Sequence, residues 1–386
     1  MLRQSKDAPA GNGIGRRILH AIATMEGGGA ERQLAYLSGG LVRLGWEVHV
    51  ACLRGGTNGK RLEESGATVH RLPCVGTHDP LLGLRLAALG AKIRPALVQS
   101  WLLLMDTHLG VYSQLAGIPW ILSERNSAPA YAQSWKESLR RRLGRKADAI
   151  VANSTAGLDY WASNAGRSRS RLFVIRNAVP VDQIESQEPI FGNEHAIPEA
   201  RPFVLYAGRL ENQKNIANLM AAFKIVMSET SAVVAICGEG RLQEFVREQL
   251  KAALMAERAI VPGYVANLWQ WLKRADVFVS VSHYEGCPNT VLECMASGCP
   301  LVVSDIPAHR EILDRTTAVL VDPNSPAAIA EGVLSVLRNR DAAVFRSQRA
   351  LATVRQWSQD SIAREYEKVY AAVLNDRSKS SLREPV

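Results

Sequence analysis

The chain has 386 residues, 47% of them hydrophobic and 22% charged. That length allows two ordinary domains with sizeable cores, and the composition excludes a disordered chain. The formal net charge of +9 is uneven, because residues 1–181 hold 24 Lys and Arg against 12 Asp and Glu, while the remainder holds 22 against 25. We therefore expect the first half to approach something anionic.

The six cysteines form no C-x-x-C pair and do not alternate with histidine at metal-ligand spacing. This usage indicates a reducing compartment. The first residues lack the apolar core of a signal peptide, and the longest apolar runs are far shorter than the ~20 residues that span a bilayer. The sequence predicts a cytoplasmic protein that could sit peripherally on the inner face of the cell membrane.

Residues 1–15 are predicted to be a disordered tail, and apolar strands and amphipathic helices then alternate through 16–181. Strands are expected at 16–23, 47–53, 67–73, 96–102, 119–124, 147–154 and 171–179, and the clearest helices at 30–45, 80–94 and 107–117. Apolar strands separated by helices of this kind indicate a parallel sheet covered on both faces.

The stretch 182–201 breaks this alternation, because it is polar, contains Pro189 and Pro198 and has no clear period. It is predicted to be a linker. The alternation then restarts and predicts a second domain at 202–355, followed by a helix and tail at 356–386 that cross back toward the first domain. The expected fold class is α/β, with two doubly wound Rossmann-like domains whose sheets face a ligand-binding cleft.

The strongest functional signal is SHYEGCPNTVLECMASGCP at 282–300. A loop follows a buried strand here, and Pro288 suits the first turn of the next helix, so the helix amino terminus is an anion site. Glu285 lies in the loop and Glu293 about two turns into the helix. One carboxylate could meet a sugar and the other a ribose. The alternative is a surface loop with a solvated acid, although Glu293 is flanked by core positions.

Two other loops carry functional signals, and each follows the first strand of its domain. In YAGRLENQKN at 206–215, Arg209 and Lys214 flank a turn and could both reach one diphosphate. The alternative is a solvated basic loop. In EGGGAERQ at 26–33, three glycines let a ligand approach the backbone, unless they form only a flexible turn. The third glycine of the NAD fingerprint is absent, so NAD binding is not predicted.

Together these motifs resemble the family 4 glycosyltransferases of GT-B fold, which are retaining enzymes, over roughly residues 16–375. E-G-x-P-N-x-x-x-E at 285–293 matches that family's E-x7-E signature, and G-R-L-x-x-x-K-N at 208–215 matches its diphosphate-binding loop. G-G-A-E-R at 28–32 matches its first glycine loop.

Two departures from the family pattern are informative. The segment IRNAVPVD at 175–182 has Ala178 where glycine is usual. SERN at 123–126 stands where many relatives keep a histidine, which resembles the subset acting on lipid-linked oligosaccharide and polysaccharide precursors.

The resemblance implies a retaining hexosyltransferase that moves a sugar from a nucleotide-sugar, with UDP favoured, to a lipid-linked or polysaccharide-precursor acceptor. Arg209 and Lys214 would hold the departing diphosphate and Glu285 the sugar, and the phosphate itself would take the acceptor's proton. The nucleotide-sugar-binding residues that it implies are Gly28, Gly29, Gly208, Gly238, Tyr264, Gly286, Cys287, Pro288, Asn289, Thr290 and Glu293. The acceptor-binding residues that it implies are Glu124, Arg125 and Asn126. The chain has no D-x-D motif, so transfer without a metal or other cofactor is expected.

Two other functions stay open at this point. Non-hydrolysing nucleotide-sugar epimerases share the fold, but they use a different set of acids and a histidine. A degenerate transferase could serve as a scaffold, although Arg209, Lys214, Glu285 and Glu293 are all retained.

The segment 134–146, SWKESLRRRLGRK, carries Lys136, Arg140, Arg141, Arg142, Arg145 and Lys146. Trp135, Leu139 and Leu143 recur every four residues and share one helical face. The segment is interpreted as a helix on an anionic membrane surface. The alternative is that the apolar face packs on the domain core and the basic groups are merely solvated. Nucleic acid is not predicted as a partner, because no aromatic residues are interleaved for stacking on bases.

Overall fold

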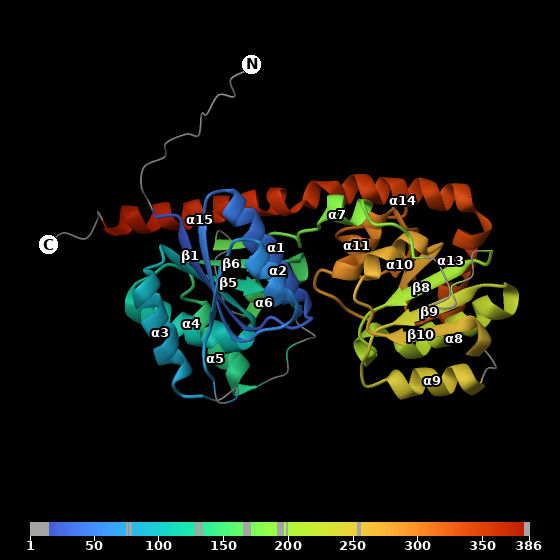
Figure 1. The fold of residues 1–386 in the computed structure, drawn as a ribbon, viewed down its shortest axis with the longest axis horizontal. Coiled ribbons are helices and arrows are strands. Elements are labelled where there is room, and N and C mark those ends of the chain that lie inside the picture. Colours follow the sequence, from blue (N-terminus) through green and yellow to red (C-terminus); the bar gives the residue numbers. More distant parts are fainter. Residues whose placement is uncertain are drawn as a thin grey trace, which may run out of the picture.

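The computed structural model contains two α/β domains that lie side by side, with the last helices of the chain running along one edge of both (Figure 1). The structure describes residues 15–74, 76, 79–127, 131, 134–164, 171–190, 197, 200–252 and 256–381. All but the last residue of the predicted tail at 1–15 lies outside these ranges.

The first domain is built on a seven-stranded parallel sheet in the order β3-β2-β1-β4-β5-β6-β7. Its strands are β1 (Arg17–Thr24), β2 (Glu47–Arg54), β3 (Thr68–Arg71), β4 (Leu97–Trp101), β5 (Trp120–Glu124), β6 (Ala149–Ala152) and β7 (Leu172–Val174). Its helices are α1 (Gly29–Arg43), α2 (Thr57–Glu64), α3 (Leu82–Ile93), α4 (Leu102–Ala116), α5 (Trp135–Gly144) and α6 (Thr155–Asn164). The neighbours Ile18 and Leu19 in β1 belong to separate core clusters, one on each face of the sheet, so the strand is apolar without alternation.

The second domain has a six-stranded parallel sheet in the order β10-β9-β8-β11-β12-β13. Its strands are β8 (Phe203–Ala207), β9 (Val233–Cys237), β10 (Ala259–Gly263), β11 (Val277–Ser280), β12 (Leu301–Ser304) and β13 (Val319–Val321). Its helices include α8 (Ile216–Glu229), α9 (Gln243–Ala252), α10 (Leu268–Arg274), α11 (Asn289–Ser297), α12 (Pro307–Arg310) and α13 (Pro326–Arg338). The strand order reverses between β1 and β4 and again between β8 and β11. The predicted fold class of two doubly wound domains is confirmed.

The predicted linker at 182–201 is corrected at its start. The helix α7 (Val181–Glu185) lies there, and its Val181 and Ile184 are buried in the core of the second domain, against α11. This turn of helix therefore belongs to the second domain by its packing. Residues 191–196 and 198–199, in the rest of the predicted linker, lie outside the described residues.

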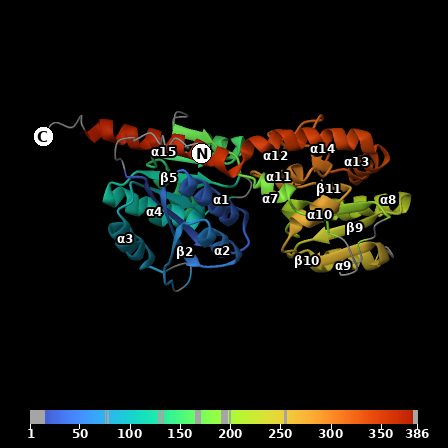
Figure 2. The same cartoon turned by 45° about the horizontal axis from the view of Figure 1, so that its top comes forward.

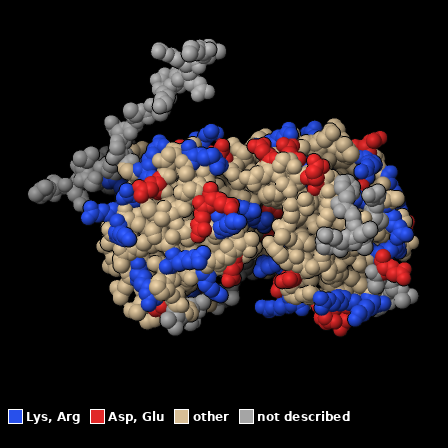
Figure 3. Space-filling model, viewed as in Figure 1, with Lys and Arg blue, Asp and Glu red and all other residues tan. Residues whose placement is uncertain are grey.

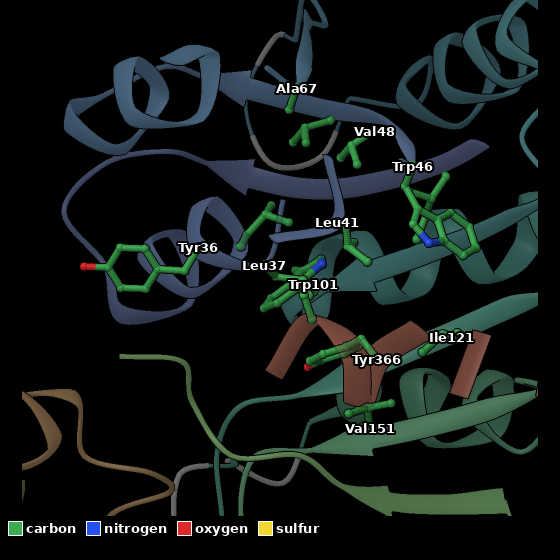
Figure 4. Close-up of a cluster of buried hydrophobic side chains, with 14 of the residues drawn as sticks. Tyr36, Leu37, Leu41, Trp46, Val48, Ala67, Trp101, Ile121, Val151 and Tyr366 are labelled. Atoms are coloured by element: carbon green, nitrogen blue, oxygen red, sulfur yellow. The ribbon is translucent and has the colours of Figure 1, made fainter. Parts of the chain in front are cut away.

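The chain returns to the first domain through its last helix. After α14 (Arg340–Val354), helix α15 (Gln359–Ser381) runs along the first domain beside α1 (Figures 1 and 2). A Cβ atom at Gly40 of α1 would lie 2.6 Å from the Cβ of Ala363, so glycine permits this close packing. Tyr366 is buried with Trp101 in the same core (Figure 4), and the Tyr370 hydroxyl donates to Gln99 Oε1 at 2.5 Å. The first domain thus contains the end of the chain in its core.

Deleting residues 359–386 should abolish the cooperative unfolding of the first domain while the second domain keeps its own transition. Six buried side chains of α15 would leave the first core, and none of them belongs to the core clusters of the second domain. Differential scanning calorimetry measures both transitions. The control deletion of residues 382–386 keeps α15 and should change neither. Two intact transitions without α15 would contradict its place in the core.

Candidate active site

A cavity of about 790 Å³ lies between the two domains. Its walls are formed largely by loops that follow the strands of both sheets, and Figure 3 shows the hollow between the domains with basic side chains at its rim. The three predicted catalytic residues, Glu285, Arg209 and Lys214, all line it. The predicted nucleotide-sugar-binding residues that line it are Gly28, Gly29, Gly208, Gly238, Tyr264, Gly286, Cys287, Pro288, Asn289 and Thr290. Of the predicted acceptor-binding residues, Arg125 and Asn126 line it.

Two helix amino termini meet at this cavity. Helix α1 begins at Gly29 and α11 at Asn289, and neither N-cap residue, Gly28 or Pro288, supplies a capping side chain. The uncapped backbone amides and the helix dipole favour an anion at each terminus. A Cβ at Gly29 would lie 2.6 Å from Asn289 Nδ2, so a larger residue here would displace the Asn289 side chain. The arrangement suits a ligand that carries several negative charges.

Lys214 and Glu285 form an ion pair in the wall of the second domain. Lys214 Nζ lies 2.5 Å from Glu285 Oε1, which also accepts a hydrogen bond of 2.6 Å from the Ser282 hydroxyl. Burial by itself would raise the pKa of Glu285, but Lys214 and Ser282 bring that pKa below its usual value. Glu285 is therefore an ionised acceptor of hydrogen bonds at neutral pH.

Gln213 also lines the cavity and braces this wall. Its Oε1 accepts a hydrogen bond of 3.3 Å from the Arg209 guanidinium, and its Nε2 donates to the Tyr284 carbonyl at 2.9 Å. Its own carbonyl accepts from the His283 amide at 2.9 Å. Gln213 was not among the predicted site residues, although it lies between the two cations of the basic loop. It connects that loop to the loop that carries Glu285.

Gly238 lines the cavity beside the basic loop and packs against the backbone of Gly208. Gly238 has a φ of +133°, and a Cβ there would lie 1.9 Å from the carbonyl oxygen of Gly208. Its amide donates to the Gly263 carbonyl at 2.7 Å. No side chain can be added at Gly238 without moving the turn that precedes Arg209.

The side chain of Asn289 joins the two domains instead of projecting freely into the cavity. Its Oδ1 accepts hydrogen bonds from Gln33 Nε2 at 3.1 Å and from Asn177 Nδ2 at 2.7 Å. Nearby, a Cβ at Gly286 would lie 3.0 Å from the Arg125 carbonyl oxygen. The loop of the E-x7-E segment is therefore in direct contact with the first domain.

Glu293 does not line the cavity, in contrast to the other predicted nucleotide-sugar-binding residues. It is buried, and Arg32 Nη1 of the first domain lies 2.6 Å from its Oε1. Burial raises the pKa of Glu293, against the opposing effect of Arg32 and Arg61. Arg32 itself lines the cavity. It belongs to the matched G-G-A-E-R motif but was not predicted as a site residue, because its partner lies 261 positions away in the chain.

The acceptor-side prediction is corrected at Glu124. Its carboxylate is fully buried and does not line the cavity, and its Oε2 accepts a hydrogen bond of 2.9 Å from Arg140. Arg140 is corrected too, because it was expected at the basic surface and is instead 1% exposed. Arg125 does reach the cavity, but its guanidinium is already engaged by Asn177 at 3.1 Å and the Tyr366 hydroxyl at 2.8 Å.

Comparison with known families identifies the domains. Residues 28–178 match the model described as "Glycosyl transferase 4-like domain", and residues 187–352 match "Glycosyl transferases group 1". The two matches cover the loops that supply Gly28, Arg125, Arg209 and Glu285 to the cavity. The chain is a glycosyltransferase of the GT-B type. The family resemblance and the enzyme class that were expected from the sequence are confirmed.

Relatives and solved structures of this glycosyltransferase agree with that assignment. It is 24% identical over 365 residues, 89% of this chain and 96% of the relative, to an N-acetylgalactosamine-N,N'-diacetylbacillosaminyl-diphospho-undecaprenol 4-alpha-N-acetylgalactosaminyltransferase of Campylobacter jejuni. It is 26% identical to a lipopolysaccharide core biosynthesis mannosyltransferase of Rhizobium meliloti, over 62% of this chain and 69% of the relative. Its fold matches HepE of Anabaena in complex with UDP, with a TM-score of 0.79 and 16% identity over 92% of this chain and 100% of that chain.

Replacing Arg32 by alanine should destabilise the glycosyltransferase by about 3 kcal/mol, because it leaves the buried Glu293 carboxylate without its cation. Urea unfolding measures the loss. The matched control is Arg43→Ala on the same helix, whose ion pair with Asp360 is half exposed and should cost about 0–1 kcal/mol. Adding Glu293→Gln to Arg32→Ala should recover most of the stability, because no buried charge then remains.

The cost of Arg32→Ala should also depend on pH. A folded carboxyl with a raised pKa binds its proton more tightly than the unfolded chain does, so the penalty grows as pH rises through the folded pKa and disappears below the unfolded one. Removing Arg32 raises that pKa further. The variant should therefore lie closer to the wild type at pH 5 than at pH 7, and a pH-independent difference would contradict the buried pair.

Proposed function

We propose that this glycosyltransferase is a retaining hexosyltransferase that moves a sugar from a UDP-sugar to a lipid-linked or polysaccharide-precursor acceptor. The observation that carries the donor assignment is the pairing of two cations, Arg209 and Lys214, with the free amino terminus of α11 in one cavity. Together they offer a diphosphate three sources of positive potential. UDP is proposed as the nucleotide because fold neighbours from Anabaena are complexes with UDP and UDP-glucose.

In the proposed reaction, Arg209 and Lys214 stabilise the charge that develops on the diphosphate as it leaves. The ionised Glu285, held beside Lys214, accepts hydrogen bonds from the sugar. The departing phosphate takes the proton of the acceptor hydroxyl, so the new bond forms on the face that the leaving group vacates and the anomeric configuration is retained. Among the described residues no cluster of three His, Cys, Asp or Glu side chains suits a metal ion, and metal-independent transfer stays a prediction.

A lipid-linked acceptor is proposed because relatives from Campylobacter and Rhizobium carry names that place their acceptors on undecaprenyl diphosphate and in the lipopolysaccharide core. An acceptor of that kind would be presented at a membrane surface. In the described part of the chain no helix is long and apolar enough to cross a bilayer. The enzyme would therefore have to meet such an acceptor from the membrane surface.

The membrane contact is proposed for one helical layer of the first domain, formed by α3, α4 and α5. Of nine large apolar side chains that are exposed among the described residues, six lie on or next to these helices. They are Leu81, Leu84, Val111, Leu115, Trp135 and Leu139. Trp135 is 71% exposed beside Lys136, whose ammonium lies 5.8 Å from the indole ring. An apolar layer with adjacent cations suits the headgroup region of an anionic bilayer.

Arg209→Ala should lower kcat for sugar transfer by ~100-fold, the scale of losing one charge-stabilising donor. Transfer is measured with and without EDTA, by release of UDP from UDP-sugars and by chromatography of the product. Arg247→Ala, an exposed arginine on α9, is the control and should keep wild-type kinetics. A wild-type enzyme that binds donors without turnover would indicate a scaffold, and loss of activity in EDTA would contradict the metal-free scheme.

Co-sedimentation with liposomes tests the membrane layer. The protein should bind vesicles that contain anionic lipid, and binding should fall with rising salt and after Trp135→Ala or the double change Arg141→Glu with Arg142→Glu. The matched control reverses two exposed charges elsewhere, Lys60→Glu with Arg241→Glu, and should change binding less. Equal binding to neutral and anionic vesicles would contradict the proposal.

A further inference from the structure

We propose that Glu124 and Arg140 are positioning residues that hold the acceptor wall of the cavity in place from behind. The acceptor wall is defined here as Arg125–Ser127, the segment that directly follows β5. Neither residue lines the cavity, so neither is given a role in contacting substrate. The inference rests on the proposed function only in assigning this segment to the acceptor, because the contacts themselves do not depend on the reaction.

Glu124 has both carboxylate oxygens fully engaged. Oε1 accepts hydrogen bonds from the backbone amide of Asn126, at 2.9 Å, and from the hydroxyl of Tyr131. Oε2 accepts from Arg140 Nη2 at 2.9 Å and from the indole Nε1 of Trp161 at 2.8 Å. Four donors around one buried carboxylate fix its position. Because one of them is the amide of a cavity-lining residue, the carboxylate also fixes the course of the acceptor wall.

Arg140 is the single cation of this cluster. It is 1% exposed and lies within 2.6 Å of Asp106, 2.9 Å of Glu124 and 3.3 Å of Glu137. Its guanidinium also stacks 5.0 Å from the centre of the Trp161 ring. One guanidinium thus bridges β5, α4 and α5, and it neutralises the carboxylate that holds the wall.

Burying this cluster of charged side chains costs stability. Three carboxylates share one guanidinium, and burial raises the pKa of Asp106 to about 6 in spite of Arg140. Apolar side chains of similar volume would commonly be as stable or more stable. What they could not do is donate and accept hydrogen bonds at fixed points, and this is the property that the acceptor wall uses.

The wall and Glu124 are also packed closely against α6. A Cβ at Gly157 of α6 would lie 2.9 Å from the Asn126 carbonyl oxygen and 3.1 Å from Glu124 Cγ. Toward the cavity, the Arg125 carbonyl oxygen faces Gly286, next to the catalytic Glu285. The wall therefore lies between the buried cluster and the loop of the E-x7-E segment, and a displaced Glu124 would move the acceptor relative to the donor sugar.

The kinetic test compares Glu124→Gln, Arg140→Lys and Gly157→Ala with the wild type. Each should raise KM for the acceptor tenfold or more, with little change in KM for the donor or in the Kd of UDP. Gly157→Ala crowds the wall and Glu124 without removing a charge, so it remains informative if Arg140→Lys does not fold. The matched control for a merely structural carboxylate is Asp148→Asn, which loses an ion pair with Arg377 in the same domain and should leave acceptor KM unchanged.

Hydrogen exchange at the Asn126 amide gives a second readout that needs no substrate. In Glu124→Gln this amide should exchange at least tenfold faster than in the wild type, while in Asp148→Asn it should not. If the wild type transfers no sugar to a lipid-linked acceptor, the proposed function fails and exchange alone decides the inference. The inference would be overturned if the Asn126 amide of Glu124→Gln exchanged at the wild-type rate. It would also be overturned if Asp148→Asn raised the acceptor KM as much as Glu124→Gln does.

Discussion

The hydrogen bonds around Asn289 are the constraint on which the cavity depends. A single amide group, at the first residue of α11, accepts from Gln33 of α1 and from Asn177 at the end of the first domain. The two helix amino termini therefore face each other at a fixed separation, with Gly29 leaving the space between them. Because both sheets direct their strand ends here, this contact and the Arg32–Glu293 pair together hold the loops of the two domains at their separation across the cavity.

The two carboxylates of the E-x7-E segment differ because their cations come from different places. Glu285 is paired with Lys214 of its own domain, which brings its pKa down, so its charge does not depend on where the first domain lies. Glu293 is paired with Arg32 of the other domain, and burial keeps its pKa high. Two identical side chains in one motif thus have separate tasks. The partner of Glu285 lies within its own domain, whereas the pairing of Glu293 needs both domains in contact.

Local patterns in the sequence were sufficient for the fold and most of the cavity, because parallel strands place the loops that follow them at one edge. They were insufficient where a charged side chain pairs with a residue far away in the sequence. Arg140 lies among five other basic residues and looks solvated, yet it is buried against Asp106 and Glu124. Arg32 pairs with a residue of the other domain. Helix α2 was missed because its sequence, TNGKRLEE, has a single apolar side chain and so no helical period.

The burial of α15 in the first domain has a consequence for biosynthesis. Nascent chains usually complete their domains from the amino terminus onward. Here the first core stays incomplete until residues 362–373 have left the ribosome, since these supply Tyr366 and Tyr370. All of the residues in the two core clusters of the second domain lie before them, so that domain can close earlier. The first domain is then the last part of the enzyme to mature, and a chain that ends before α15 carries a first domain with an incomplete core.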